Sequence, residues 1–320
     1  MTDTASWEKT IRYHSFHEEM KKRFGEKVYR ISINAGMTCP NRDGKIGTGG
    51  CIFCSEGGSG EFAGEKTSSV SEQIAHGIEK IRKKAPTCRL FVAYFQAYTN
   101  TYAPVEKLRA LYEEAVSCKD QGIVAISIAT RPDCLGDEVV ALLKEINEKM
   151  PVWVELGLQT MHEDSARFIR RGYELSCYEQ AVAKLKQAGI EVITHLILGL
   201  PGETKEQILE SVDYVAACHT DGIKLQLLHV LKGTDLADYV QNHAYSYMDM
   251  ETYADLVVDC LERIPSEIVI HRLTGDGPKW LLVGPMWSAD KKRVRNLISK
   301  KLRERDTWQG KVAKNSMRRG

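Results

Sequence analysis

The chain has 320 residues, of which 43% are hydrophobic and 27% are charged, a balance typical of folded globular domains and not of disordered chains. Its apolar stretches fall short of the roughly 18–20 residues that a membrane span needs. The first residues also lack the apolar core of a secretory signal. We therefore expect a cytoplasmic protein without a membrane partner, built as one large α/β barrel or as two ordinary domains.

The formal net charge of +1 conceals an uneven distribution along the chain. Residues 291–320 contain twelve Lys or Arg and two Asp or Glu, whereas residues 1–290 contain 32 basic and 41 acidic residues. A basic C-terminal arm on an acidic body predicts electrostatic contact with a polyanion such as RNA. A charged tail that only promotes solubility is the alternative.

Residues 1–27 are expected to form a helical lead-in, and they precede a regular alternation of short apolar and longer amphipathic segments. Strands are predicted at 28–35, 89–97, 123–130, 152–158, 190–198 and 223–230. Helices are predicted at 69–84, 104–119, 137–149, 163–171, 176–187 and 204–217. This alternation is typical of parallel β–α–β units. Six units over residues 28–235 indicate an open six-stranded barrel, with a doubly wound sheet as the alternative.

Several predicted strands carry polar residues on one face only. Arg30, Ser32 and Asn34 share one face of the first strand, and Glu155 shares a face with Gln159 on the fourth. A closed eight-stranded barrel fills its interior with branched apolar side chains. One polar face therefore favours an open barrel that holds a polar ligand inside it.

Residues 236–320 form a C-terminal extension outside this alternation. It begins with a helical pattern at 251–263 and continues through the short predicted strand IVIHRL. Within the basic arm, apolar residues recur at helical spacing and predict an amphipathic helix, namely Val294, Leu297, Ile298 and Leu302.

Three of the nine cysteines lie together on a glycine-rich loop after the first strand, as Cys39-x11-Cys51-x2-Cys54. The other six are scattered, and we expect most of them to be buried. A [4Fe–4S] cube takes four ligands, so three thiolates leave one iron open to a cofactor. The alternative is a structural zinc ion, which requires a fourth ligand such as His14 or His17.

The cysteine loop, with Phe53 just before its last cysteine, resembles that of the radical SAM superfamily. The superfamily usually has three residues between the first two cysteines; the eleven found here are similar to the longer loop of the Elongator catalytic subunit. Further motifs closely resemble the YtqA/YhcC-like radical SAM proteins, namely AYFQAYTNTY (93–102), ATRPDCL (129–135), VELGLQT (154–160), IRRGY (169–173) and HLILGLPGET (195–204).

This resemblance implies an α/β fold, a partial (β/α)6 TIM-like barrel of the radical SAM type with a C-terminal extension. It also implies a [4Fe–4S] cluster on Cys39, Cys51 and Cys54 that binds S-adenosylmethionine (SAM). An external electron donor then reduces the cluster, and cleavage of SAM gives a 5′-deoxyadenosyl radical that abstracts hydrogen from the substrate.

The resemblance further implies which residues contact SAM. Phe53 would lie near the adenine, the stretch from Gln96 to Thr99 near the amino group, and Glu155 and Gln159 near the ribose and methionine. Arg167 or Arg171 would pair with the carboxylate, and the turn at Gly199 would let backbone approach the cofactor. Tyr98 and Cys177 are candidate hydrogen-atom donors. For the arginines a solvated helix face is the alternative, and for the Gly199 turn it is simple chain reversal.

The relatives implied by this resemblance act on tRNA, and the Elongator likeness points to carbon 5 of the wobble uridine. Because no segment corresponds to the acetyltransferase domain of the Elongator subunit, we expect remodelling of an existing side chain by hydrogen abstraction. The basic arm would contact the tRNA. Two alternatives stay open: a radical SAM enzyme acting on a small molecule, and a zinc-stabilised RNA-binding protein.

Overall fold

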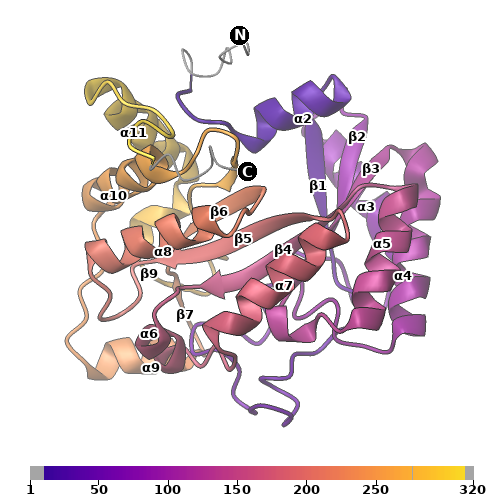
Figure 1. Cartoon of the computed structure of the whole chain (residues 1–320), viewed down its shortest axis with the longest axis horizontal. Coiled ribbons are helices and arrows are strands. Elements are labelled where there is room, and N and C mark those ends of the chain that lie inside the picture. Colours follow the sequence, from indigo (N-terminus) through magenta and orange to yellow (C-terminus); the bar gives the residue numbers. More distant parts are fainter. Residues whose placement is uncertain (1–10, 276, 314–320) are drawn as a thin grey trace.

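A computed structural model describes residues 11–275 and 277–313 and places a curled parallel sheet at the centre of the molecule (Figure 1). The strand order is β1-β2-β3-β4-β5-β6-β8, and every neighbouring pair is parallel. The strands are β1 (Val28–Ile33), β2 (Leu90–Phe95), β3 (Ile123–Thr130), β4 (Val152–Gln159), β5 (Glu191–Leu198), β6 (Gly222–Leu227) and β8 (Val269–Arg272). The predicted α/β partial barrel is confirmed.

Helices cover the outer face of the sheet between successive strands (Figure 1). They are α3 (Val70–Arg82), α4 (Val105–Ser117), α5 (Asp137–Lys149), α7 (Leu175–Gln187) and α8 (Lys205–Ala217), whereas the short α6 (Glu163–Phe168) lies at the carboxyl-end side of the strands. Local sequence sets two of their starts, because Ser69 and Thr204 form capping boxes with Glu72 and Gln207. Short 3-10 turns follow α4 at Cys118–Gln121 and β3 at Pro132–Cys134.

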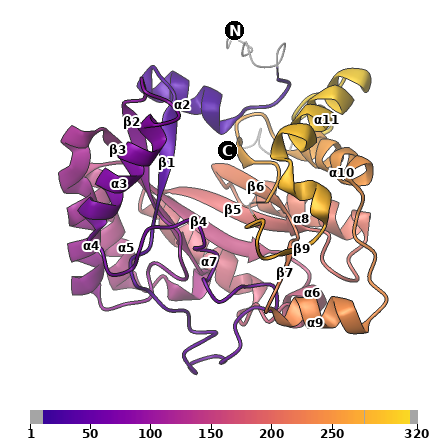
Figure 2. The same cartoon turned by 180° about the vertical axis from the view of Figure 1, so that it is seen from behind.

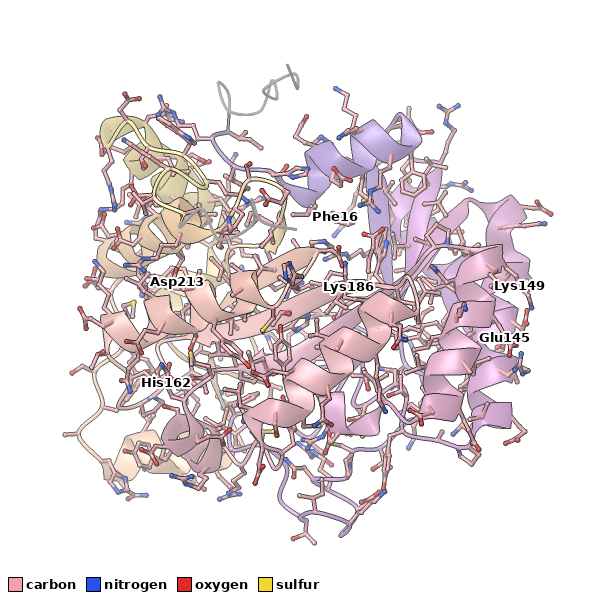
Figure 3. All side chains as sticks on the ribbon, viewed as in Figure 1. Phe16, Glu145, Lys149, His162, Lys186 and Asp213 are labelled. Atoms are coloured by element: carbon pink, nitrogen blue, oxygen red, sulfur yellow. The ribbon has the colours of Figure 1, made fainter. Side chains whose placement is uncertain are left out.

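The layer between sheet and helices is apolar, whereas the outward helix surfaces are charged. Phe91, Leu142 and Leu156, from β2, α5 and β4, are at most 1% exposed. Figure 3 shows Glu145 and Lys149 projecting outward from α5. This amphipathic division is why the 3.6-residue pattern located the helices in the sequence.

The barrel has a seventh strand, one more than predicted, because the segment IVIHRL joins the sheet as β8 beside β6. The predicted strand 223–230 in turn splits, since β6 ends at Leu227 and Val230–Leu231 forms β7. Strand β7 pairs antiparallel with β9 (Leu282–Gly284). Residues 227–231 are mostly apolar, so hydrophobicity alone could not mark the break.

The remaining elements are α9 (Asp235–Asn242), α10 (Met250–Arg263), a 3-10 turn at Met286–Ala289 and α11 (Lys291–Glu304). The predicted amphipathic helix of the basic arm is confirmed as α11, whose Val294, Ile298 and Leu302 are fully buried. Its charges are partly matched within the chain, since Lys301 lies 2.8 Å from both Glu251 and Asp255 of α10. The last basic residues, 314–320, lie outside the described residues.

The predicted helical lead-in contains α2 (Phe16–Phe24), and residues 1–10 lie outside the described residues. Phe16 and Met20 pack against Trp153 of β4 and cover the amino-terminal end of the barrel. The segment before α2 meets distant parts of the chain: Ser15 bridges Ile270 of β8, and the backbone N–H of His14 donates to Gln309 Oε1 at 2.8 Å.

In the part of the chain that the structure describes, no helix is both long enough and apolar enough to cross a membrane.

Candidate active site

A cavity opens at the carboxyl ends of the strands, where ligands of open parallel sheets usually bind. The loop after β1 forms one wall, and Gln96, Gly157 and Arg272 mark the ends of β2, β4 and β8 on its other sides. Tyr94, Glu155, His195 and Lys224 lie one layer deeper, on the inner face of the sheet. Figure 2 shows the long segment after β1 crossing below the strand ends toward α9, and Leu236 of α9 donates its N–H to Ile52 O at 2.9 Å.

All three clustered cysteines line this cavity. The turn of the CxxC pair is closed by a hydrogen bond from Cys54 N–H to Cys51 O at 2.9 Å. Arg42 fastens the end of the loop, because its guanidinium donates to the carbonyls of Cys54 and Ser55 at 2.8 and 2.7 Å. Glycine is required at position 50, where φ is +73° and a Cβ would lie 2.8 Å from Arg42 Nε.

The donor set suits an iron–sulfur cluster. In residues 11–275 and 277–313, no three His, Cys, Asp or Glu side chains stand close enough to hold a single metal ion. A cubane binds each thiolate through a different iron, so its ligands are spaced more widely than those of one ion. Burial, and then the neighbouring Cys54, raises the pKa of Cys51 to about 12, so this thiol is protonated until a metal displaces the proton.

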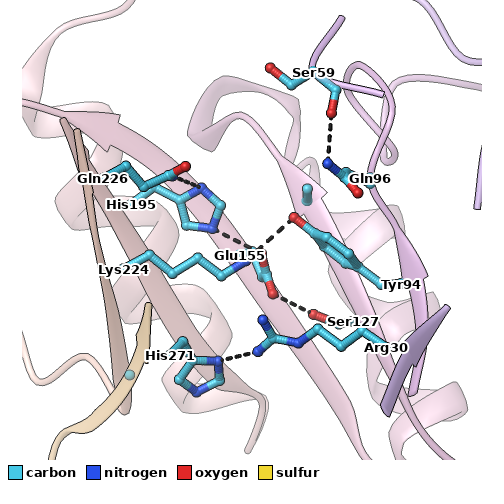
Figure 4. Close-up of polar contacts among 12 residues, drawn as sticks. Arg30, Ser59, Tyr94, Gln96, Ser127, Glu155, His195, Lys224, Gln226 and His271 are labelled. Carbon is cyan, nitrogen blue, oxygen red and sulfur yellow. Dashed lines mark hydrogen bonds and ion pairs between the residues drawn. The ribbon is translucent and has the colours of Figure 1, made fainter. Parts of the chain in front are cut away.

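A second loop, residues 55–61, is held over the end of β2. Gln96 Nε2 donates to Ser59 O at 2.7 Å, as Figure 4 shows, and the Tyr98 hydroxyl donates to Glu56 O. Tyr98 has a φ of +62°, and a Cβ on Gly58 would lie 2.4 Å from the Tyr98 ring. Gln96 and Tyr98 therefore both line the cavity and position this loop, and Thr99 lies beside them, 2% exposed.

Glu155 is the centre of a buried polar cluster on the inner face of the sheet (Figure 4). Its Oε1 accepts a hydrogen bond from Ser127 at 2.7 Å, and its Oε2 contacts His195 Nε2 at 2.9 Å and the Lys224 ammonium. Burial raises the pKa of Glu155, but the Lys224 charge and the His195 hydrogen bond outweigh burial and lower it well below its usual value. The carboxylate is therefore ionised and matched by Lys224.

His195 is neutral at physiological pH. Burial, and then the charge of Lys224, lowers its pKa to about 4. Gln226 Nε2 lies 3.1 Å from His195 Nδ1, so an Nε2-protonated ring donates to Glu155 and accepts from Gln226. His195 and His229 both line the cavity.

Positive charge exceeds negative charge around this cluster. Arg30 Nη2 donates to His271 Nδ1 at 2.8 Å (Figure 4), and its guanidinium stacks on the Phe16 ring at 4.1 Å.

Sequence reasoning missed Lys224 and Tyr94 as members of the site. The available signal was the alternation within IKLQLL, which puts Lys224 and Gln226 on one face of an otherwise apolar strand.

The structure brings most of the predicted SAM contacts to one cavity. Its lining contains Phe53, Gln96, Thr99, Glu155 and Gln159 together with the three cysteines, Cys39, Cys51 and Cys54. Gln159 ends β4 with a φ of +72°, and its Oε1 is buried without a hydrogen-bond partner in the described structure. An unpaired buried acceptor at a cavity wall is a polar group available to a ligand.

Three predicted residues lie apart from this cavity. Arg167 is exposed on α6, where it pairs with Asp164. Gly199 has a φ of +89°, and its carbonyl accepts a hydrogen bond from Tyr245 at 3.2 Å. Cys177 lies in the first turn of α7 and is absent from the cavity lining. The spacing of such residues in the sequence does not indicate whether each one will face the cavity or point away from it.

Arg171 reaches the cavity wall, but its guanidinium is committed to the surrounding backbone. The side chain is 2% exposed, Nη1 donates to Thr160 O at 2.7 Å and Nε donates to Tyr173 O at 3.0 Å. Its Nη2 also pairs with Glu163 at 2.9 Å. These bonds fix the turn between α6 and α7 beneath the cysteine loop.

Comparison with known proteins agrees with this geometry. Residues 37–215 match the Radical SAM superfamily, and residues 220–304 match the Radical_SAM C-terminal domain. YtqA of Bacillus subtilis is 45% identical over 300 residues, which cover 94% of this chain and 92% of YtqA. YhcC of Escherichia coli is 36% identical over 273 residues, 85% of this chain and 86% of YhcC.

More distant relatives carry names that refer to tRNA. A tRNA uridine(34) acetyltransferase of Methanocaldococcus jannaschii is 24% identical and covers 82% of this chain, which spans 54% of that relative. The structure of Elp3 from Methanocaldococcus infernus matches with a TM-score of 0.67 at 16% identity, over 88% of this chain and 64% of that chain, a likeness of fold. The match of residues 37–215 to the superfamily, together with YtqA and YhcC, shows that the chain belongs to the radical SAM superfamily and to the family of YtqA and YhcC, with a [4Fe–4S] cluster and SAM as cofactors.

Proposed function

We propose that this protein remodels the carbon-5 side chain of a tRNA wobble uridine by hydrogen abstraction. When bound, the cluster and SAM supply the abstracting radical. Cys39, Cys51 and Cys54 would hold the cluster, and a cytoplasmic electron donor would reduce it. The observation that carries the proposal is the position of these three thiols on the wall of a polar cavity inside the open barrel.

Other residues of the cavity would bind and orient the cofactor and the substrate. Phe53 offers an aromatic face beside the cysteines, and the unpaired Gln159 Oε1 offers an acceptor to a hydroxyl or amine. Gln96 and Tyr98 hold the loop formed by residues 55–61 in place. This loop and the residues around Pro278 border the cavity and limit access of water to it.

The tRNA substrate is supported by the likeness to the tRNA uridine(34) acetyltransferase and by the basic arm. This chain spans 54% of that relative, and the reaction we propose is hydrogen abstraction within the radical SAM part that the two proteins share. The arm is amphipathic, and its exposed cations include Lys292, Arg293 and Arg303 on α11. These residues can contact RNA phosphates.

The test is a nucleoside analysis of tRNA from a strain that lacks the gene. We expect one wobble-uridine nucleoside to accumulate in an incompletely processed form. Wild-type protein and Cys218→Ser, a partly buried cysteine at the end of α8, should restore the normal profile, whereas Cys54→Ser should not. An unchanged profile would contradict the tRNA assignment and leave a small-molecule substrate.

Metal analysis tests the cluster separately. Protein purified without oxygen should be brown and contain iron and sulfide, and Cys39→Ser or Cys51→Ser should lose both. A colourless protein that contains zinc and no iron would rule out the radical chemistry.

A further inference from the structure

Two aromatic rings, Phe62 and Trp280, lie exposed against each other at the surface. Phe62 is 45% exposed and Trp280 is 61% exposed, and their ring centroids are 5.8 Å apart with an interplanar angle of 74°. They come from segments more than 200 residues apart in the sequence. Exposed apolar side chains gathered in one place indicate an interaction surface.

The pair sits at the rim of the cavity that contains the cysteines. Ser59 and Glu61, just before Phe62, line the cavity, and so do Gly277 and Pro278, just before Trp280. The Phe62 ring therefore projects from the loop on the cysteine side of the rim, and the Trp280 ring projects from the C-terminal extension. A molecule that enters the cavity passes beside both rings.

Backbone hydrogen bonds hold each ring-bearing segment in place. Ala63 N–H donates to Gly60 O at 2.8 Å, and Gly64 N–H donates to Ser32 O at 3.1 Å, which ties the turn around Phe62 to β1. Leu281 N–H donates to Pro278 O at 3.0 Å, and Lys232 N–H donates to Leu281 O at 2.8 Å. Rings held in this way lose little freedom when another flat group packs on them.

Two exposed lysines stand next to the rings in the sequence, Lys66 after Phe62 and Lys279 before Trp280, and can contact phosphates. Glu56 and Glu65 are also exposed on the Phe62 segment, so contact with a base depends on the rings and not on net charge. The start of α11 also faces this side, because the charge of Lys291 acts on Arg272 and His229, which both line the cavity.

We propose that Phe62 and Trp280 form a platform on which one base of a single-stranded RNA loop stacks, next to the nucleotide that enters the cavity. This inference rests on the proposed function and names the surface through which the tRNA is held. Bases in a loop expose their faces, whereas bases in a duplex do not, so stacking selects an unpaired segment. Flanking lysines then contact the adjoining phosphates.

The test measures binding of a fluorescently labelled anticodon stem–loop RNA to the full-length, cluster-loaded protein by anisotropy. Trp280→Ala should weaken binding about tenfold, as is usual for loss of one base-stacking ring, and Phe62→Ala should weaken it less. Trp280→Phe, which keeps a ring, should retain most of the affinity. Met286→Ala is the control, because Met286 is also an exposed apolar side chain (64%) but lies outside the cavity lining and before the basic arm.

A loop nucleotide without a base identifies the contact. Removing one base of the seven-membered loop should weaken binding to the wild type and have little further effect on Trp280→Ala, since both changes remove the same contact. Equal effects of Trp280→Ala and Met286→Ala, or a baseless nucleotide that weakens binding to the wild type and to Trp280→Ala alike, would overturn the platform. So would a monomer–dimer equilibrium, followed by sedimentation, that Trp280→Ala abolishes while RNA affinity stays the same.

The two proposals fail in different ways. If RNA binding depends on Trp280 while the tRNA nucleosides of the deletion strain are normal, the platform stands and the proposed reaction fails. If the nucleosides change while Trp280→Ala binds RNA as the wild type does, the reaction stands and the platform fails.

Discussion

The two faces of the central sheet are equally buried and chemically opposite. On β4, Leu156 points outward into the apolar layer beneath the helices, and its neighbour Glu155 points into the barrel; both are at most 1% exposed. The outer face is buried because apolar side chains leave water. The inner face is buried although it holds ions, and the Glu155 carboxylate is stable there because Lys224 and Ser127 contact it.

This contrast teaches where function can be sought in such a fold. Burial of an apolar face is favourable in itself, because each Å² of apolar surface removed from water contributes about 25 cal/mol. A buried face with Arg30, Glu155 and Lys224 gains less from burial, so its composition points to a ligand. Four changes, from the largest expected effect to the smallest, can break or sharpen the comparison.

The largest effect is expected from Lys224→Ala. It leaves the Glu155 carboxylate buried without its cation, and loss of one partner of a buried pair costs about 3–5 kcal/mol. Leu156→Ala on the outer face should cost a similar amount, about 2–5 kcal/mol, through the cavity it leaves. Urea unfolding monitored by circular dichroism measures both.

A second substitution separates the two faces. Glu155→Leu should restore much of the stability lost in Lys224→Met, because the pair is replaced by apolar side chains of similar volume. The double variant should fold and still fail to cleave SAM. If Lys224→Met alone were as stable as the wild type, the inner face would not depend on its ion pair. If the double variant were active, the polar residues of this face would not be needed for function.

A smaller effect concerns pH. The pKa of His195 is lowered to about 4, first by burial and then by Lys224, whereas an unfolded histidine titrates near about 6.5. Below this value the unfolded chain binds a proton that the native chain excludes, so stability falls as the pH drops from 6.5 toward 4. Between about pH 7 and 5 this group contributes a loss on the order of 2 kcal/mol.

His195→Gln should therefore flatten the decline in stability over this window. Burial also lowers the pKa of His229 to about 4, so part of the slope should persist. His17→Gln serves as the control, because that side chain is 52% exposed. Unfolding curves of His195→Gln and wild type that stay parallel from pH 7 to pH 5 would contradict the prediction.

The smallest effect is expected at the outer surface of the C-terminal extension. Lys301 pairs with Glu251 and Asp255, whose side chains are 64% and 48% exposed. Partners open to solvent contribute little, so Lys301→Ala should change the free energy of unfolding by less than about 1 kcal/mol. A loss as large as that of Lys224→Ala would contradict the comparison, because it would show that the cost of removing a lysine does not depend on whether its partners are buried.

Much of the fold could be predicted because most segments repeat at one clear period. The strand at 123–130 and the helix at 137–149 have the predicted bounds. The sheet membership of β8 could not be predicted, since pairing with β6 depends on a chain reversal through α9 and α10 that leaves no local pattern. The helical spacing of Val294, Leu297, Ile298 and Leu302, by contrast, sufficed to locate α11.

The candidate site was predictable where its chemistry depends on residue type, and less so where it depends on the direction in which a side chain points. Cysteine spacing pointed to Cys39, Cys51 and Cys54, and the polar face of β4 pointed to Glu155 and Gln159; all five line one cavity. Arg167 and Arg171 lie four positions apart, yet one is exposed and the other is 2% exposed, because a turn between α6 and α7 interrupts the helix. Lys224 was missed because a lysine among apolar residues gives no sign of its partner on another strand.

The contact between the two ends of the described chain has a consequence for biosynthesis. Helix α2 closes the amino-terminal end of the barrel, and its leading segment is secured by Gln309 and by the edge of β8. A nascent polypeptide delivers residues 11–24 almost 300 positions before Gln309. Helix α2 therefore lacks these contacts until Gln309 has been made, and the amino-terminal end of the barrel closes late in synthesis.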